Sequence, residues 1–128
     1  MELEVTFPGG VTVDASVGGF TVRTDQTAQD GGGNSAPSPL SLLFVSLATC
    51  AGFYALRFCQ VRQIDTKGLG LTMKVERSDQ GRVATLRIEL KLPPGFPEKY
   101  KGAIVRAVDG CTVKRIVLDP PKFEIVTL

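Results

Sequence analysis

Short segments near the start of the chain alternate apolar and polar residues. Apolar side chains recur at every second position from Leu3 to Phe7 and from Val11 to Ala15, and Phe20 begins a third such segment. This period is typical of strands with one face against a core. Gly9-Gly10 and Gly18-Gly19 separate the segments and supply turn residues. The pattern predicts a three-stranded meander.

Residues 24–38, TDQTAQDGGGNSAPS, break this alternation and predict a polar, glycine-rich loop. Glycine runs can cradle phosphate when a Gly-Lys-Ser/Thr sequence follows and a helix begins there. No such sequence follows Gly31-Gly32-Gly33. The loop is therefore not expected to bind phosphate.

A long apolar run follows, with no charged residue between Asp30 and Arg57. Its most apolar part, Leu40 to Leu56, is near the lower length limit for a membrane span, contains several hydroxyl residues and has no basic cluster before it. We therefore expect a helix buried on most sides rather than a membrane segment. Ser38 suits the N-cap and Pro39 the first helical position, and the helix should extend to about Gln63.

Alternation returns at residues 69–77 and 82–92, and the turn sequence Ser-Asp-Gln-Gly lies between them, which predicts a β-hairpin. Residues 96–108 place apolar side chains on one side of a second helix. A short helical segment is expected over 111–118 and a closing strand over 123–126. The expected order, βββ-α-ββ-α-α-β, indicates an α+β fold.

Composition narrows the class of protein. A chain of 128 residues that is 43% apolar can build one core, so a single domain over residues 1–128 is expected. The net charge of +2 is small and the basic residues form no run, which disfavours nucleic acid as a partner. The first residues do not resemble a secretory signal, so a cytoplasmic location is the default expectation.

Histidine is absent and there are only three cysteines. The first fact excludes Cys–His and Ser–His dyads and every zinc site that needs an imidazole. An odd number of cysteines is not typical of an extracellular disulfide framework. Each cysteine is therefore either a small buried residue or a reactive thiol.

Cys50 and Cys59 lie on the same predicted helix, about half a turn apart around its axis and about 13 Å apart along it. A disulfide needs Cα atoms within about 7 Å, so these two cannot pair within one chain. Cys59, between Phe58 and Gln60, is interpreted as a packing residue. For Cys50 the residues alone also favour packing, although Arg57, two turns later, could hold a thiolate.

Cys111 follows Asp109-Gly110 at the start of a helical segment. Free backbone N–H groups and the helix dipole at such a position favour a thiolate. Lys114 and Arg115, one turn later, would add to this effect. The sequence therefore predicts that Cys111 is a reactive thiol, with burial as a small residue as the alternative.

Two motifs resemble those of the OsmC/Ohr superfamily, the osmotically inducible protein C and organic hydroperoxide resistance proteins. Residues 38–50, SPLSLLFVSLATC, are similar to the central-helix signature that presents the first active-site cysteine. Cys111-Thr112-Val113, followed by Leu118, Pro120-Pro121 and Phe123, resembles the second cysteine motif and the entry to the last strand. The predicted order of elements matches the family along nearly the whole chain.

The resemblance implies an intertwined homodimer with the central helices buried against each other and the active sites at the interface. It also implies a thiol peroxidase with an antioxidant function in the stress response. The Cys50 thiolate would attack an organic hydroperoxide, the sulfenic acid would condense with Cys111, and an external dithiol would reduce the disulfide. No metal or organic cofactor is implied, and neither a membrane nor nucleic acid is an expected partner.

The family's peroxidases also pair an arginine near the first strands with a glutamate at the head of the central helix. Around that glutamate this chain has Leu40 and Ser41, which cannot form an ion pair. Arg23 is the nearest arginine in the early strands, and Arg57 could substitute by geometry. The alternative to a peroxidase is therefore a non-enzymatic OsmC-like dimer with inert thiols, which senses redox state or binds a small apolar ligand.

Overall fold

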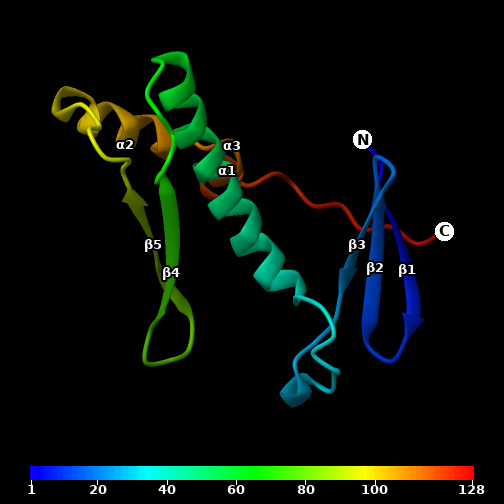
Figure 1. The fold of residues 1–128 in the computed structure, drawn as a ribbon. Helices are drawn as coiled ribbons and strands as arrows, with labels where there is room; N and C mark the ends of the chain where they lie inside the picture. Colours follow the sequence, from blue (N-terminus) through cyan, green and yellow to red (C-terminus); the bar gives the residue numbers. More distant parts are fainter. The chain divides into compact units, whose positions relative to one another are not determined.

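The computed structural model describes residues 1–128. Its helices and strands follow the order β1, β2, β3, α1, β4, β5, α2, α3, which confirms an α+β fold (Figure 1). The chain divides into two compact units, residues 1–45 and residues 46–128, and α1 (Pro39–Val61) is continuous across the boundary. The single domain expected over residues 1–128 stays a prediction.

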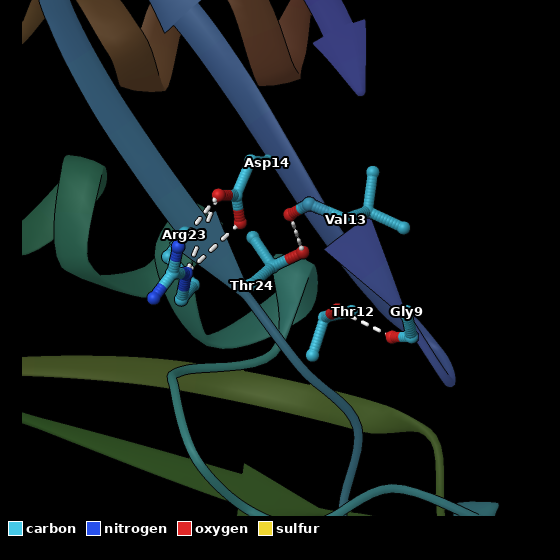
Figure 2. A network of polar contacts seen from close by, with 6 residues as sticks. All are labelled: Gly9, Thr12, Val13, Asp14, Arg23 and Thr24. Carbon is cyan, nitrogen blue, oxygen red and sulfur yellow. Dashed lines mark hydrogen bonds and ion pairs between the residues drawn. The ribbon is translucent and has the colours of Figure 1, made fainter. Parts of the chain in front are cut away.

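The predicted meander is confirmed in the first unit. The strands β1 (Glu4–Gly9), β2 (Thr12–Val17) and β3 (Phe20–Thr24) form an antiparallel sheet in that order. Figure 2 shows the polar contacts that tie β2 to β3: the guanidinium of Arg23 donates to both carboxylate oxygens of Asp14, and Thr24 Oγ1 donates to the carbonyl of Val13 at 2.7 Å. The most buried residues of this sheet, Asp14 and Thr24, are polar, and both take part in these hydrogen bonds.

The glycine-rich loop after β3 is organised by the buried carboxylate of Asp25. Its Oδ2 accepts from the backbone N–H groups of Gly33 and Ser35, at 3.1 and 2.9 Å, and from the Ser35 hydroxyl at 2.7 Å, and Oδ1 accepts from the N–H of Gln26 at 2.8 Å. These hydrogen bonds, led by those from Ser35, lower the pKa of Asp25 to about 2. The loop is thus folded around an ionised side chain of its own.

The predicted start of α1 is confirmed. Ser38 Oγ accepts from the N–H of Ser41 at 3.2 Å, as an N-cap does, and Pro39 occupies the first helical position. The helix ends at Val61, slightly before the predicted Gln63. At Gln63 the backbone has a φ of 55°, a left-handed conformation that cannot continue a right-handed helix.

Within the chain, α1 is buried along one face only. Ala51, Ala55, Phe58 and Cys59 are buried there, whereas other apolar side chains of the helix are exposed, among them Leu43, Val45, Phe53 and Leu56. The prediction of a helix buried on most sides is therefore met on that face alone. By length and apolar composition α1 is also the one helix that could cross a bilayer, a criterion that core helices of soluble proteins can meet as well.

The second unit contains the rest of α1, the hairpin and two shorter helices. The predicted hairpin is confirmed as β4 (Gly70–Arg77) and β5 (Val83–Lys91), which pair antiparallel. The second helix begins later than predicted, because a 3-10 turn at Glu98–Tyr100 precedes α2 (Lys101–Asp109). The third is confirmed as α3 (Thr112–Leu118). The core lies where the buried face of α1 meets α2 and the apolar side of the hairpin.

The strand predicted over residues 123–126 is wrong for this structure. No regular structure follows α3, and neither sheet includes this segment. Phe123, Ile125 and Val126 are 81, 94 and 80% exposed. An alternating sequence becomes a strand only where another strand offers it a hydrogen-bonding edge, and no strand of this chain pairs with the tail.

Candidate active site

The structure brings Cys50 and Cys111 together in the second unit. Cys50 lies in the middle of α1 and is half-buried, and Cys111 is the residue before α3 and is buried. Both thiols are free, and the Cys111 thiol donates a hydrogen bond to the sulfur of Cys50. Two cysteines 61 positions apart in the sequence are thus in direct contact.

The first turn of α3 also faces Cys50. The backbone N–H groups of Val113 and Thr112 donate to its sulfur. These groups have no partner inside a helix, so they are available to a neighbouring anion. The hydroxyls of Tyr54 and Thr112 share a hydrogen bond of 2.8 Å, which holds α1, one turn beyond Cys50, against the start of α3.

The two thiols have opposite pKa shifts. For Cys50, burial raises the pKa, but the hydrogen bonds from Cys111, Val113 and Thr112 outweigh it and hold the pKa below its usual value. For Cys111, burial and the hydrogen bond to Cys50 raise the pKa and outweigh the opposing hydrogen bonds from the amides of Lys114 and Val113. Hydrogen bonds that are donated to a sulfur stabilise its thiolate. Cys50 is therefore the more acidic thiol of the pair.

The predicted effect of the start of α3 on Cys111 is present, because the amides of Lys114 and Val113 lower its pKa, but burial and the hydrogen bond to Cys50 outweigh it. The amides of Thr112 and Val113 also lower the pKa of the neighbouring Cys50. The two basic side chains of α3 are engaged elsewhere: Lys114 Nζ pairs with Asp109, and the guanidinium of Arg115 donates to the carbonyl of Gly110 at 3.1 Å. Cys111 itself is buried and acts as a hydrogen-bond donor.

Cys59 lies in the core, as predicted for a packing residue. Its side chain is fully buried among the apolar residues that join α1 to α2. Burial raises its pKa, with a smaller opposing effect from Arg62. Its thiol is therefore protonated at neutral pH and has no access to a solvent-borne substrate.

The two arginines predicted to stabilise the thiolate have other partners. Arg57 Nη1 donates to Gln60 Oε1 at 3.0 Å and is not among the groups that lower the pKa of Cys50. Arg23 lies in the first unit, where its guanidinium is 3.0 Å from a carboxylate oxygen of Asp14. The role predicted for both arginines stays a prediction.

An apolar cavity of about 660 Å³ reaches Cys111 within the second unit. Cys111 forms part of its wall, together with Ala51 on α1, Ile104 on α2 and apolar side chains of the hairpin, namely Met73, Leu86, Ile88 and Leu90. Lys101, Asp109 and Lys114 are its charged lining residues. A pocket of this size and lining suits a small organic molecule.

The residues do not form a recognisable metal site. No group of three or more Cys, Asp or Glu side chains is close enough to hold a metal ion. The chemistry available at the site is therefore that of two thiols in contact, two backbone amides and an apolar cavity.

The family model described as OsmC-like protein matches residues 31–126. The chain belongs to the OsmC-like family. The match includes both motifs, since it covers α1 with Cys50 and the segment from Cys111 through the Pro-Pro pair. No curated protein sequence matches this OsmC-like chain with significance.

Solved structures share the OsmC-like fold. A protein from Psychrobacter arcticus, described as an osmotic stress induced and detoxification response protein, superposes with a TM-score of 0.75 at 22% identity, over 88% of this chain and 85% of that one. An OsmC-like protein from Mycoplasma pneumoniae gives 0.69 at 16%, over 93% and 87%. The organic hydroperoxide resistance protein OsmC from Legionella pneumophila gives 0.58 at 15%, over 91% and 87%. Identities this low establish the fold.

Sequence reasoning missed the groups that make Cys50 the acidic thiol. The amides of Thr112 and Val113 and the hydroxyl contact between Tyr54 and Thr112 were not expected. A signal was present, because the same free amides were recognised at the start of the last helix. Only the fold shows which sulfur they face.

Proposed function

We propose that this OsmC-like protein is a thiol-dependent peroxidase that reduces organic hydroperoxides. One observation carries the proposal: hydrogen bonds from the Cys111 thiol and from two backbone amides hold the pKa of Cys50 below its usual value, and this more acidic thiol is in contact with a second thiol whose pKa is raised. A thiolate is the nucleophile in such chemistry, and an adjacent thiol resolves the oxidised product.

The reaction proceeds in two steps on the protein. The Cys50 thiolate attacks the terminal oxygen of ROOH, the O–O bond breaks, and the leaving alkoxide takes a proton and departs as ROH. Cys50 is then a sulfenic acid, oxidised by two electrons. The Cys111 thiol condenses with it, which forms the Cys50–Cys111 disulfide and releases water.

An external dithiol completes the cycle. It exchanges with the disulfide, returns both cysteines to thiols and leaves as its own disulfide. Hydrogen peroxide and hydroperoxides with an organic group share the reacting O–O bond, so the choice between them depends on the pocket. The apolar cavity beside Cys111 would bury an organic group, which favours the organic substrate.

The comparisons support a redox function in a general sense. The family match covers both cysteine motifs, and one neighbour in fold is described as an organic hydroperoxide resistance protein. We further propose that the protein acts as a homodimer in the cytoplasm, with neither a membrane nor nucleic acid as a partner. No cofactor enters the proposed cycle.

The second candidate is a non-enzymatic OsmC-like dimer that senses redox state or binds a small apolar ligand. Leu40 and Ser41, at the head of α1, favour it, because neither side chain can form the ion pair that the family's peroxidases use. In this chain Ser41 instead contacts the N-cap, with its Oγ 3.0 Å from that of Ser38. The contact between Cys50 and Cys111 favours the enzyme.

Steady-state turnover separates the two candidates. With cumene hydroperoxide and excess dithiothreitol, we expect catalytic consumption by the native chain and by Cys59→Ala, and none by Cys50→Ser. With Cys111→Ser, a stoichiometric loss of about one peroxide per chain is expected when dithiol is left out. Hydroperoxide loss no faster than that of dithiothreitol alone would support the non-enzymatic candidate.

A further inference from the structure

A second pocket lies between the C-terminal part of α1 and α2, on residues that the proposed chemistry does not use. It is open and has a volume of about 460 Å³. Three arginines border it, Arg57 and Arg62 on α1 and Arg106 on α2. The apolar surface comes from Tyr54, Phe58 and Val61 and from two alanines of α2. None of the lining residues is acidic.

The three guanidinium groups have no carboxylate partner. None of them takes part in an ion pair of this chain, although six other pairs form, most of them on the surface. Arg57 donates to the side-chain oxygen of Gln60, and Arg62 donates to the carbonyl of Phe58 at 3.3 Å. Three like charges around one pocket repel each other, and an anion between them would relieve that repulsion.

Packing already holds one of these arginines in place. The guanidinium carbon of Arg62 lies 3.7 Å from the centre of the Phe58 ring and 5.4 Å from that of Tyr100. A guanidinium stacked on a ring keeps its edge N–H groups free to bind a carboxylate in the ring plane. Arg106 lies on the opposite side of the pocket, with Nη1 above Gly102, where the absent side chain leaves room.

We propose that this pocket binds a small organic acid, whose carboxylate is held by Arg62 and Arg106 and whose apolar body lies on Val61 and the alanines of α2. The unpaired guanidinium groups select a carboxylate because their donors match its two oxygens. The apolar surface selects an organic body over an inorganic ion. The pocket adjoins the active site through Tyr54, whose hydroxyl binds Thr112. The site does not depend on peroxidase activity.

A matched pair of probes tests charge and shape separately. 2-Naphthoate and 2-naphthamide have nearly the same size and apolar body, and only the first is an anion. In a two-dimensional NMR titration of the full chain, naphthoate should shift the amide signals of residues 54–62 and 103–107 to saturation. Naphthamide and inorganic phosphate should each bind at least about tenfold more weakly, as expected for losing the charge or the apolar body.

Arginine variants then assign the charge. Arg62→Gln and Arg106→Gln should each weaken the binding of naphthoate about tenfold. Arg82→Gln is the matched control, because Arg82 also lacks an ion pair but donates to Gln80 in the hairpin turn. It should leave naphthoate binding unchanged. Because Arg62 packs on Phe58, Arg106→Gln decides the test if Arg62→Gln does not fold.

Several results would overturn the proposal. Naphthoate could bind no more tightly than naphthamide or phosphate, or show no saturable binding at all. The shifted signals could be confined to the cavity beside Cys111. Arg82→Gln could weaken naphthoate binding as much as the pocket variants do.

Discussion

At the scale of single residues, the two touching cysteines differ because of the direction of one hydrogen bond. Cys111 donates and Cys50 accepts, so the same contact lowers the pKa of Cys50 and raises that of Cys111. The amides of Thr112 and Val113 further lower the pKa of Cys50, whereas for Cys111 the amides of Lys114 and Val113 do not outweigh burial and the hydrogen bond to Cys50. The sequence could not predict this difference in pKa between the two cysteines, since both were expected on or beside helices.

Removal of the Cys111 thiol should make Cys50 less acidic. In Cys111→Ala one of the donors to the Cys50 sulfur is lost, so the pKa of Cys50 should rise toward its usual value. The rate of iodoacetamide labelling at Cys50, followed by mass spectrometry from pH 6 to 10, should have a higher midpoint than in the native chain. Cys59→Ala should leave the midpoint unchanged; an unchanged midpoint in Cys111→Ala would show that Cys111 does not stabilise the thiolate.

Because of Asp25, the stability of the first unit should vary with pH in the acid range. Its pKa is about 2 when folded and 3.8 in the unfolded reference. A lowered pKa stabilises the fold above the unfolded value, and this stabilisation is lost as the pH falls from about 4 to 2. Asp25→Asn should therefore lower the thermal midpoint at pH 7 and much less at pH 2. Equal losses at the two pH values would contradict this role.

At the scale of elements, the glycine-rich loop is fixed by close backbone approach as well as by Asp25. A Cβ on Gly32 would stand 2.0 Å from the carbonyl oxygen of Gln26, which is far inside van der Waals contact. Gly32→Ala should cost on the order of 1–3 kcal/mol in the free energy of unfolding, as overpacking does. In Gly70→Ala the new Cβ would be 3.6 Å from Lys91, an ordinary contact, so this control should be nearly neutral in the same denaturant titration.

The elements that local signals define were predicted well. Ser38 and Pro39 mark the start of α1, and the alternation on both sides of Ser-Asp-Gln-Gly marks the hairpin. Elements that depend on distant partners were not. The segment 123–126 alternates as a strand does, yet nothing in this chain pairs with it. Sequence pattern gives the faces of a strand but not the edge that it needs.

At the scale of the whole molecule, the exposed apolar side chains of α1 agree with the proposed homodimer. Several large apolar side chains exposed on one helix commonly mark an interface. We expect the native chain to have twice the mass of one chain in light scattering. Phe53→Glu, which places a charge at an apolar position that is 56% exposed, should shift it toward the monomer. Gln80→Glu, in the hairpin turn, adds the same charge and should not; a monomeric native chain would contradict the proposal.

The candidate site was predicted only in part, because it too depends on contacts between distant segments of the chain. The motifs around Cys50 and Cys111 indicated the cysteines and their partnership through the family resemblance. Three features were not predicted: the donors to Cys50, the partners of Lys114 and Arg115, and the placement of Arg57 beside a separate pocket. They depend on how the elements are oriented against each other. These orientations follow from packing between elements that are distant in sequence, and a local sequence pattern carries no information about that packing.

The most direct test of the proposed chemistry is a single-turnover thiol count. The reduced chain is mixed with one equivalent of cumene hydroperoxide, free thiols are counted over time, and any disulfide is mapped by mass spectrometry. We expect rapid loss of two of the three thiols as a Cys50–Cys111 disulfide, while Cys59 stays reduced. Persistence of all three thiols for hours, or a disulfide that includes Cys59, would contradict the peroxidase.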